Sequence, residues 1–302
     1  MLDKAEDFLG RVTFVTGPEK HCGKTTFMNR AAEIARRGAR AAGLPGPALL
    51  TVGYDGEARD FLSGARKPAV PVAEGDIVVT TERFARPCSP EILDVLPGST
   101  ALGRLCVARA HRAATVSLVG PEGNSLVAWA IRSIVDGYSG TVLVDGAINR
   151  ITQAASVGGA RFVYTLRVDG GNLEKAAARV RRIAALASLP VAPRVDAARD
   201  DAARAEAFTF DGALTAATMA RIPKGAKAVV VEDFTKVFIG DSELSAFLRE
   251  RTLYVGRRIE FGGFVVACRG VSDDDFSSRL ADDALVALVA YNPYEVREGR
   301  AA

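Results

Sequence analysis

The residues best suited to chemistry lie between Gly17 and Thr26, in the stretch GPEKHCGKTT. The stretch ends in Gly-Lys-Thr-Thr, the ending of a phosphate-binding loop in which a lysine reaches the phosphates and a hydroxyl binds Mg²⁺. Gly17 lies one residue too far upstream for the usual G-x-x-x-x-G-K-[ST] spacing, and Pro18 occupies its place. One extra residue is tolerable because the Gly-Lys-Thr end and the following helix hold most of the phosphate.

The loop predicts a role for each residue at this end. Gly23 gives the backbone freedom to wrap the phosphates, Lys24 supplies the charge, and Thr25 offers its hydroxyl to Mg²⁺. The predicted nucleotide-binding residues are Gly17, His21, Cys22, Gly23, Lys24, Thr25 and Thr26. The alternative is that Gly-Lys-Thr only caps a helix.

His21 and Cys22 lie inside this loop, and they allow two interpretations. They could form a catalytic pair or a redox switch, or their side chains could fill positions that face away from the phosphates. We favour the second interpretation because neither a second cysteine for a switch nor a third member of a catalytic triad is evident.

A metal bound at such a loop needs an acidic partner. Asp145 closes the apolar run TVLV and matches a Walker B strand, which places a carboxylate beside Mg²⁺. Asp55, in TVGYDGEARD, is a second candidate metal ligand. For both residues the alternative is an aspartate that caps a turn.

Short apolar runs alternate with helical patterns along the chain. We expect strands near 12–15, 49–52, 76–80, 116–119, 141–144 and 162–166, and helices near 25–42, 125–135 and 173–186. This order predicts an α/β fold, a three-layer sandwich like that of P-loop NTPases with a mostly parallel sheet. Residues 1–193 would form the nucleotide-binding core. Residues 208–302 would form a C-terminal α/β extension or subdomain, or continue the same sheet.

Composition limits the partners. The 302 residues carry a net charge of +3, which gives no strong attraction to nucleic acid or to an anionic membrane. No secretory signal or apolar run long enough to span a bilayer is evident. The four cysteines are scattered, so we expect a cytoplasmic protein.

The guanine-reading N/T-K-x-D signature is missing, because Thr235-Lys236 is followed by Val-Phe. ATP is therefore favoured over GTP.

Several stretches together resemble a known family. They are TGPEKHCGKTT, TVGYDGEARD, RKPAVPVAEGDIVVTTERF, VSLVGPEGN leading to VLVDGAINR, EDFTKVFI and ALVAYNP. In this order they resemble the KamB-type subunit of lysine 5,6-aminomutase reactivase. The resemblance implies a partner of an adenosylcobalamin-dependent aminomutase that works beside a MutS-like ATPase subunit in the release of damaged cobalamin. The segment after Asp145 departs from the family pattern.

Two other functions fit the same loop. A small-molecule kinase or ATP-dependent ligase would use Asp145 and Asp55 for metal and acceptor, with the last third of the chain as a substrate lid. A nucleotide-binding interaction protein would bind ATP without hydrolysing it. In the resembled family, ATP hydrolysis belongs to a two-subunit system. The sequence therefore leaves open whether this chain hydrolyses ATP alone.

Overall fold

The computed structural model describes residues 2–19, 22–53, 70–146, 157–193 and 207–291. The chain forms two compact units, one of Met1–Ala176 with Phe261–Ala302 and the other of Ala177–Glu260. The first unit is thus built from two separate stretches of sequence. This division differs from the boundary at residues 194–207 that composition suggests.

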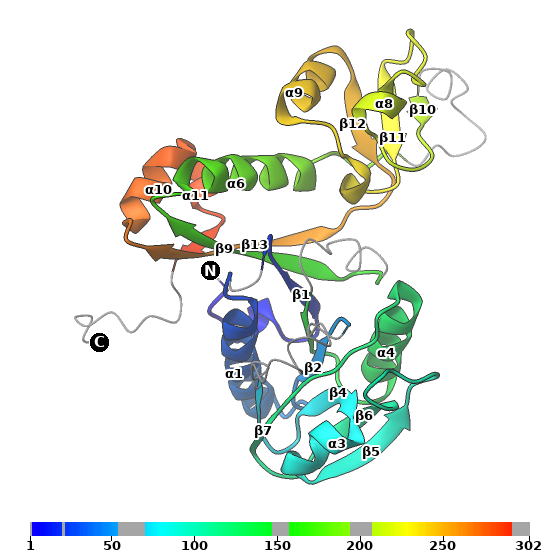
Figure 1. Cartoon of the computed structure of the whole chain (residues 1–302), viewed down its shortest axis with the longest axis vertical. Helices are drawn as coiled ribbons and strands as arrows, with labels where there is room; N and C mark the ends of the chain where they lie inside the picture. Colours follow the sequence, from blue (N-terminus) through cyan, green and yellow to red (C-terminus); the bar gives the residue numbers. More distant parts are fainter. Residues whose placement is uncertain (1, 20–21, 54–69, 147–156, 194–206, 292–302) are drawn as a thin grey trace. The chain divides into compact units, whose positions relative to one another are not determined.

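The first unit contains a mixed, mostly parallel sheet of nine strands (Figure 1). Its strand order is β14-β13-β9-β1-β8-β2-β4-β6-β5. The strands are β1 (Val12–Thr16), β2 (Ala48–Thr51), β4 (Ile77–Thr81), β5 (Pro90–Val95), β6 (Leu105–Ala110), β8 (Val142–Asp145), β9 (Arg161–Asp169), β13 (Glu260–Arg269) and β14 (Val289–Tyr291). The predicted α/β fold is therefore confirmed, and the last two strands belong to the large sheet.

The centre of this sheet is parallel and one end is not. β1 pairs in parallel with both β8 and β9, and β2 pairs in parallel with β8 and β4. β6 then runs antiparallel to β4 and to β5. Because the carboxyl ends of parallel strands meet at one edge, the ends of β1, β8, β2 and β9 lie together.

Helices cover both faces of the central strands. In Figure 1, α1 (Lys24–Ala42) and α4 (Asn124–Gly137) lie on opposite sides of the sheet. The smaller elements of this unit are η1 (Ala5–Asp7), β3 (Val70–Val72), α3 (Glu82–Ala85), η2 (Arg86–Cys88), β7 (Ala114–Val116), α10 (Asp273–Leu280) and α11 (Asp283–Val286). β3 and β7 pair as a separate antiparallel ribbon. The strand expected near 116–119 is not found there, because β7 ends at Val116 and residues 117–119 are not in a strand.

The apolar face of α1 explains where that helix packs. Phe27, Ala31 and Ile34 recur at helical spacing and are all buried. They share a core with Val15 of β1 and Leu143 of β8, among other residues. α1 therefore covers the face of the sheet to which the side chains of Val15 and Leu143 point.

The second unit is a smaller α/β assembly. Its three strands, β10 (Ala207–Thr209), β11 (Ala228–Val231) and β12 (Thr252–Val255), form a parallel sheet in that order. Its other elements are α8 (Ala216–Met219), η3 (Phe234–Lys236) and α9 (Asp241–Glu250). The helix α6 (Leu173–Ala187) contains the boundary between the two units.

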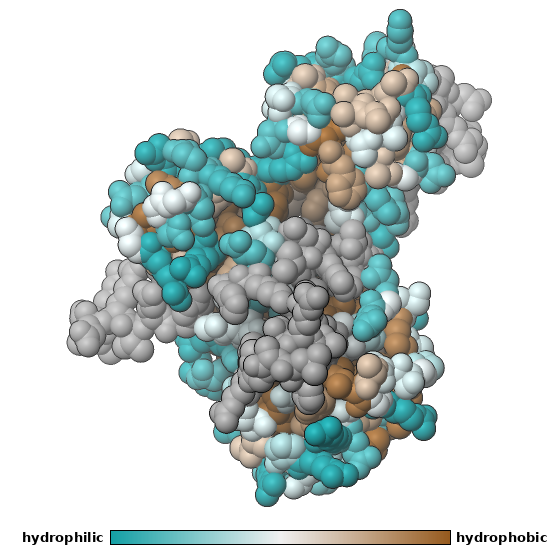
Figure 2. Space-filling view, in the orientation of Figure 1, coloured by the Kyte–Doolittle hydropathy of each residue, from teal (hydrophilic) through white to brown (hydrophobic). Residues whose placement is uncertain are grey.

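The surface is mainly polar on the face that Figure 2 shows, where hydrophobic residues appear in separate areas. The large hydrophobic residues that the described chain exposes are Leu44, Ile92, Val95, Val135, Val191, Phe238 and Leu248. Within the described residues, no helix has both the length and the apolar character required to cross a membrane.

A buried ion pair joins α1 to the segment between β3 and β4. Arg36 Nε donates to Asp76 Oδ2 at 2.8 Å, and the Asp76 side chain is only 1% exposed. Arg36 also donates to the carbonyl of Pro71 at 2.8 Å, and the Ala73 amide donates to Asp76 at 2.8 Å. Burial raises the pKa of Asp76, although Arg36 acts in the opposite direction.

We predict that Arg36→Met lowers the free energy of unfolding at pH 7 by about 3–5 kcal/mol, because it leaves a buried carboxylate without its cation. The loss should be smaller near pH 5. Removing Arg36 raises the pKa of Asp76 further. When folding raises the pKa of an aspartate, the free energy of unfolding of the protein falls as the pH rises above about 4. Urea unfolding at both pH values measures this.

The matched control is Arg109→Met, which breaks the half-exposed pair between Arg109 and Glu91. An exposed pair of this kind contributes about 0–1 kcal/mol. Equal losses in the two variants, or a loss in Arg36→Met that does not change with pH, would contradict the assignment.

Candidate functional site

The segment Gly17–Gly23 connects the end of β1 to the start of α1, as the phosphate-loop prediction requires. Gly23 precedes the helix with φ of +93°, a left-handed conformation that residues with a side chain rarely adopt. Its carbonyl accepts the first helical hydrogen bond, from the Phe27 amide at 2.9 Å. The Gly-Lys-Thr end is therefore a helix N-terminus with the geometry that anion binding needs.

Lys24 is turned back into the loop that precedes it. It is only 7% exposed, and its Nζ donates to the Glu19 carbonyl at 2.7 Å. A second, longer contact joins Nζ to Cys22 Sγ at 3.6 Å. The loop thus encloses an ammonium group, which places a positive charge at the start of α1.

Thr25 and Asp145 meet at this edge of the sheet. Thr25 Oγ1 donates to Asp145 Oδ2 at 2.6 Å, across 120 positions of sequence. The parallel register of β1 and β8 pairs Val15 with Asp145, which brings the carboxylate to the end of β1. The structure therefore brings together the hydroxyl and the carboxylate that the sequence assigned to one metal.

The backbone of Asp145 is also fixed. Its carbonyl accepts from Thr51 Oγ1 at 3.2 Å and from the Val52 amide at 3.1 Å, both at the end of β2. The next amide, that of Gly146, donates to the Val15 carbonyl at 2.8 Å. Asp145 is thus held from both neighbouring strands.

The Cys22 side chain lies between its loop and β9. Its Sγ is 3.2 Å from Thr165 Oγ1 and 3.1 Å from the Glu19 carbonyl, and the residue is 2% exposed. Thr165 Oγ1 in turn donates to the Thr16 carbonyl at 3.1 Å. The thiol is therefore part of the packing between the loop and β9.

The other cysteines lie in other elements, Cys88 in η2, Cys106 in β6 and Cys268 in β13. All four cysteines are buried free thiols. Burial raises the pKa of Cys88, and it raises that of Cys106 to about 11, so both remain protonated near neutral pH.

The remaining predicted residues have different outcomes. Gly17 is buried at the end of β1, and Thr26 is exposed on the first turn of α1. His21 and Asp55 lie outside the described residues, so their predicted roles stay predictions. Thr165 was missed by the sequence reasoning, and its only signal was its place in the strand RFVYTLRVD.

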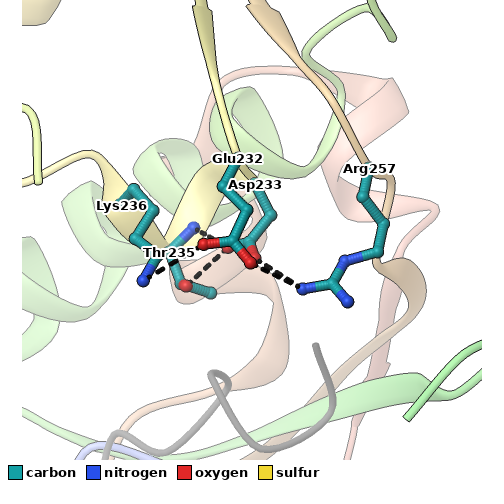
Figure 3. A network of polar contacts seen from close by, with 5 residues as sticks. All are labelled: Glu232, Asp233, Thr235, Lys236 and Arg257. Atoms are coloured by element: carbon teal, nitrogen blue, oxygen red, sulfur yellow. Dashed lines mark hydrogen bonds and ion pairs between the residues drawn. The ribbon is translucent and has the colours of Figure 1, made fainter. Parts of the chain in front are cut away.

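A second cluster of charged residues lies at the carboxyl end of β11 in the smaller unit (Figure 3). Asp233 is 1% exposed and accepts from Thr235 Oγ1 at 2.5 Å and from Arg257 at 3.3 Å. Glu232 pairs with Arg257 at 3.2 Å and with Lys236 at 3.3 Å. These charges pair with one another, so the cluster ties the turn after β11 to Arg257.

Comparisons with protein families, with curated proteins and with solved structures found no match to this chain.

We predict that Gly17→Ala destabilises the protein by about 1–3 kcal/mol through overpacking. A Cβ at this position would lie 2.4 Å from Cys22 Sγ and 2.9 Å from the Thr165 carbonyl oxygen. Chemical unfolding measures the loss. Gly123→Ala is the control, because a Cβ there meets nothing within 4 Å. Equal stability of the two variants would show that the loop does not need close approach to β9.

Proposed function

We propose that this chain binds ATP with Mg²⁺ through residues 17–26. The observation that carries the proposal is the 2.6 Å hydrogen bond between Thr25 and Asp145, one residue from the enclosed Lys24. A charge, a helix N-terminus and a hydroxyl lie within one turn of α1, and a carboxylate from β8 joins them. These are the usual parts of a phosphate-and-metal site. The alternative of a simple helix cap would not require the carboxylate on β8.

The donor set fits the two ligands. Mg²⁺ prefers oxygen ligands and is usually bound by one or two carboxylates together with phosphate oxygens. Thr25 Oγ1 and Asp145 Oδ2 are such oxygens, and Lys24 would hold phosphate as a point charge. The amides of the first turn of α1 add donors and the positive end of a helix dipole. The chain's residues would thus orient phosphate and neutralise its charge.

ATP is proposed over GTP because the sequence lacks the guanine-reading signature. Thr235 and Lys236 formed the one Thr-Lys pair that a guanine signature would need. Thr235 Oγ1 instead donates to Asp233, and Lys236 pairs with Glu232. Their polar atoms are therefore engaged within the turn after β11.

The finer proposal is that the chain is a subunit of a reactivating factor for an adenosylcobalamin-dependent aminomutase. It rests on the resemblance to the KamB-type subunit. A reactivating factor has to open a closed cofactor site, and nucleotide binding that favours one of two conformations can supply the free energy. The rivals are a small-molecule kinase or ATP-dependent ligase, and a nucleotide-binding protein without turnover.

We predict that Lys24→Ala weakens ATP binding more than tenfold, which corresponds to more than about 1.4 kcal/mol. In Asp145→Asn the amide oxygen still accepts from Thr25, so the fold is kept, but the metal loses a charged ligand. Mg²⁺ should then raise ATP affinity much less than it does for the wild type. Calorimetry with and without Mg²⁺ measures both effects.

Lys224→Ala is the control, because Lys224 is an exposed lysine of the other unit. Equal ATP affinity of wild type and Lys24→Ala would overturn the nucleotide site. An unchanged Mg²⁺ dependence in Asp145→Asn would move the metal role to another carboxylate, with Asp55 the first to test.

We predict that ATP turnover by the isolated chain is slow and that a protein raises it, because phosphoryl transfer often requires an arginine supplied in trans. The test mixes the chain with a MutS-like subunit and an aminomutase inactivated by damaged cobalamin, then adds ATP and fresh adenosylcobalamin. Recovery of mutase activity should require this chain. Identical recovery without it would exclude the reactivase, and phosphorylation of a small metabolite would favour the kinase.

A further inference from the structure

β9 extends past the end of β1 and flanks the phosphate loop. The parallel register pairs Thr16, the last residue of β1, with Tyr164. β9 then continues to Asp169, so its last residues run beside the chain that leaves β1. Thr165, the first of them, contacts Cys22 of the loop at 3.2 Å.

Arg167 lies on the same face of β9 as Thr165. Side chains at positions i and i+2 of a strand share a face, and the two positions are separated by about 6–7 Å along the strand. The Thr165 side chain marks this face as the one that the loop occupies. The Arg167 side chain is therefore on the face of β9 that the loop occupies. It lies nearer the carboxyl end of the strand, toward the edge where Lys24 and Thr25 begin α1.

The guanidinium of Arg167 has an unsatisfied donor. Its Nε is buried and has no hydrogen-bond partner, and within the described residues no carboxylate pairs with this side chain. Arg36 and Arg182, by comparison, each bind a carboxylate and a backbone carbonyl. A buried donor without a partner costs about 1–3 kcal/mol, so such a group calls for a specific reason.

We propose that Arg167 is a phosphate-binding residue of the nucleotide site. The inference rests on the proposed binding of ATP at residues 17–26. In the strand order β9-β1-β8, Arg167 and Asp145 lie on strands at opposite sides of β1. Bound phosphates would then contact Asp145 and Thr25 through the metal on one side and the Arg167 guanidinium on the other. Arginine suits this place because its planar fork of donors matches phosphate oxygens.

The test compares Arg167→Met with Arg167→Lys in the full chain. Arg167→Met replaces the guanidinium by an apolar chain, so we expect Mg²⁺–ATP to bind about tenfold more weakly by calorimetry. Without ATP the melting temperature should be unchanged or higher, because an unsatisfied donor has been removed. The rise in melting temperature on adding ATP should shrink. Arg167→Lys keeps the charge but not the fork, so its affinity should lie between those of the wild type and Arg167→Met.

The control is Arg109→Met, since Arg109 lies on β6, which β1, β8, β2 and β4 separate from β9. The inference is overturned if Lys24→Ala weakens ATP binding while Arg167→Met stays within twofold of the wild type. It is also overturned if Arg167→Met loses stability without ATP in proportion to its loss of affinity, because that indicates a structural role. If the wild type binds no ATP, the proposed function fails and the inference fails with it.

Discussion

The hydrogen bond between Thr25 and Asp145 depends on one constraint, the parallel pairing of β1 with β8. In that register the carboxylate at the end of β8 is level with Val15, and α1 begins a short loop beyond it. An antiparallel β8 would carry Asp145 to the opposite edge of the sheet. The fold therefore brings a carboxylate to a loop that lies 120 residues earlier in the chain.

A second set of contacts fixes the loop from the other side of β1. Cys22, Thr165 and the Thr16 carbonyl form a buried chain of polar contacts between loop and β9. Lys24 joins this chain through Cys22 and the Glu19 carbonyl. Because the partners are buried and mutually bonded, a change at any one of them affects the position of the ammonium group.

The sequence predicted the parts of the site that are local. The β1–loop–α1 unit and the strand that ends in Asp145 were found from apolar runs and their flanking residues, and the structure confirms both as elements. β5 and β6 were not predicted. β5 is an edge strand whose residues are mostly half-buried or exposed, so it lacks the apolar run by which a buried strand is recognised. Thr165 and Arg167 were missed because their importance comes from strand order, which local patterns do not contain.

The extra residue in the loop has a physical explanation in these contacts. In the usual spacing the first glycine allows the chain to turn around the phosphates. Gly17 instead lies directly at the end of β1, where Cys22 Sγ and the Thr165 carbonyl leave no room for a Cβ. The first glycine is thus required by close packing against β9, while Gly23 provides the left-handed turn before α1. Lys24 donates a hydrogen bond to the carbonyl of Glu19, five residues earlier, and this bond joins the two ends of the loop. The contacts that position Lys24 run through Glu19 and Cys22, so they do not require the usual spacing between the two glycines.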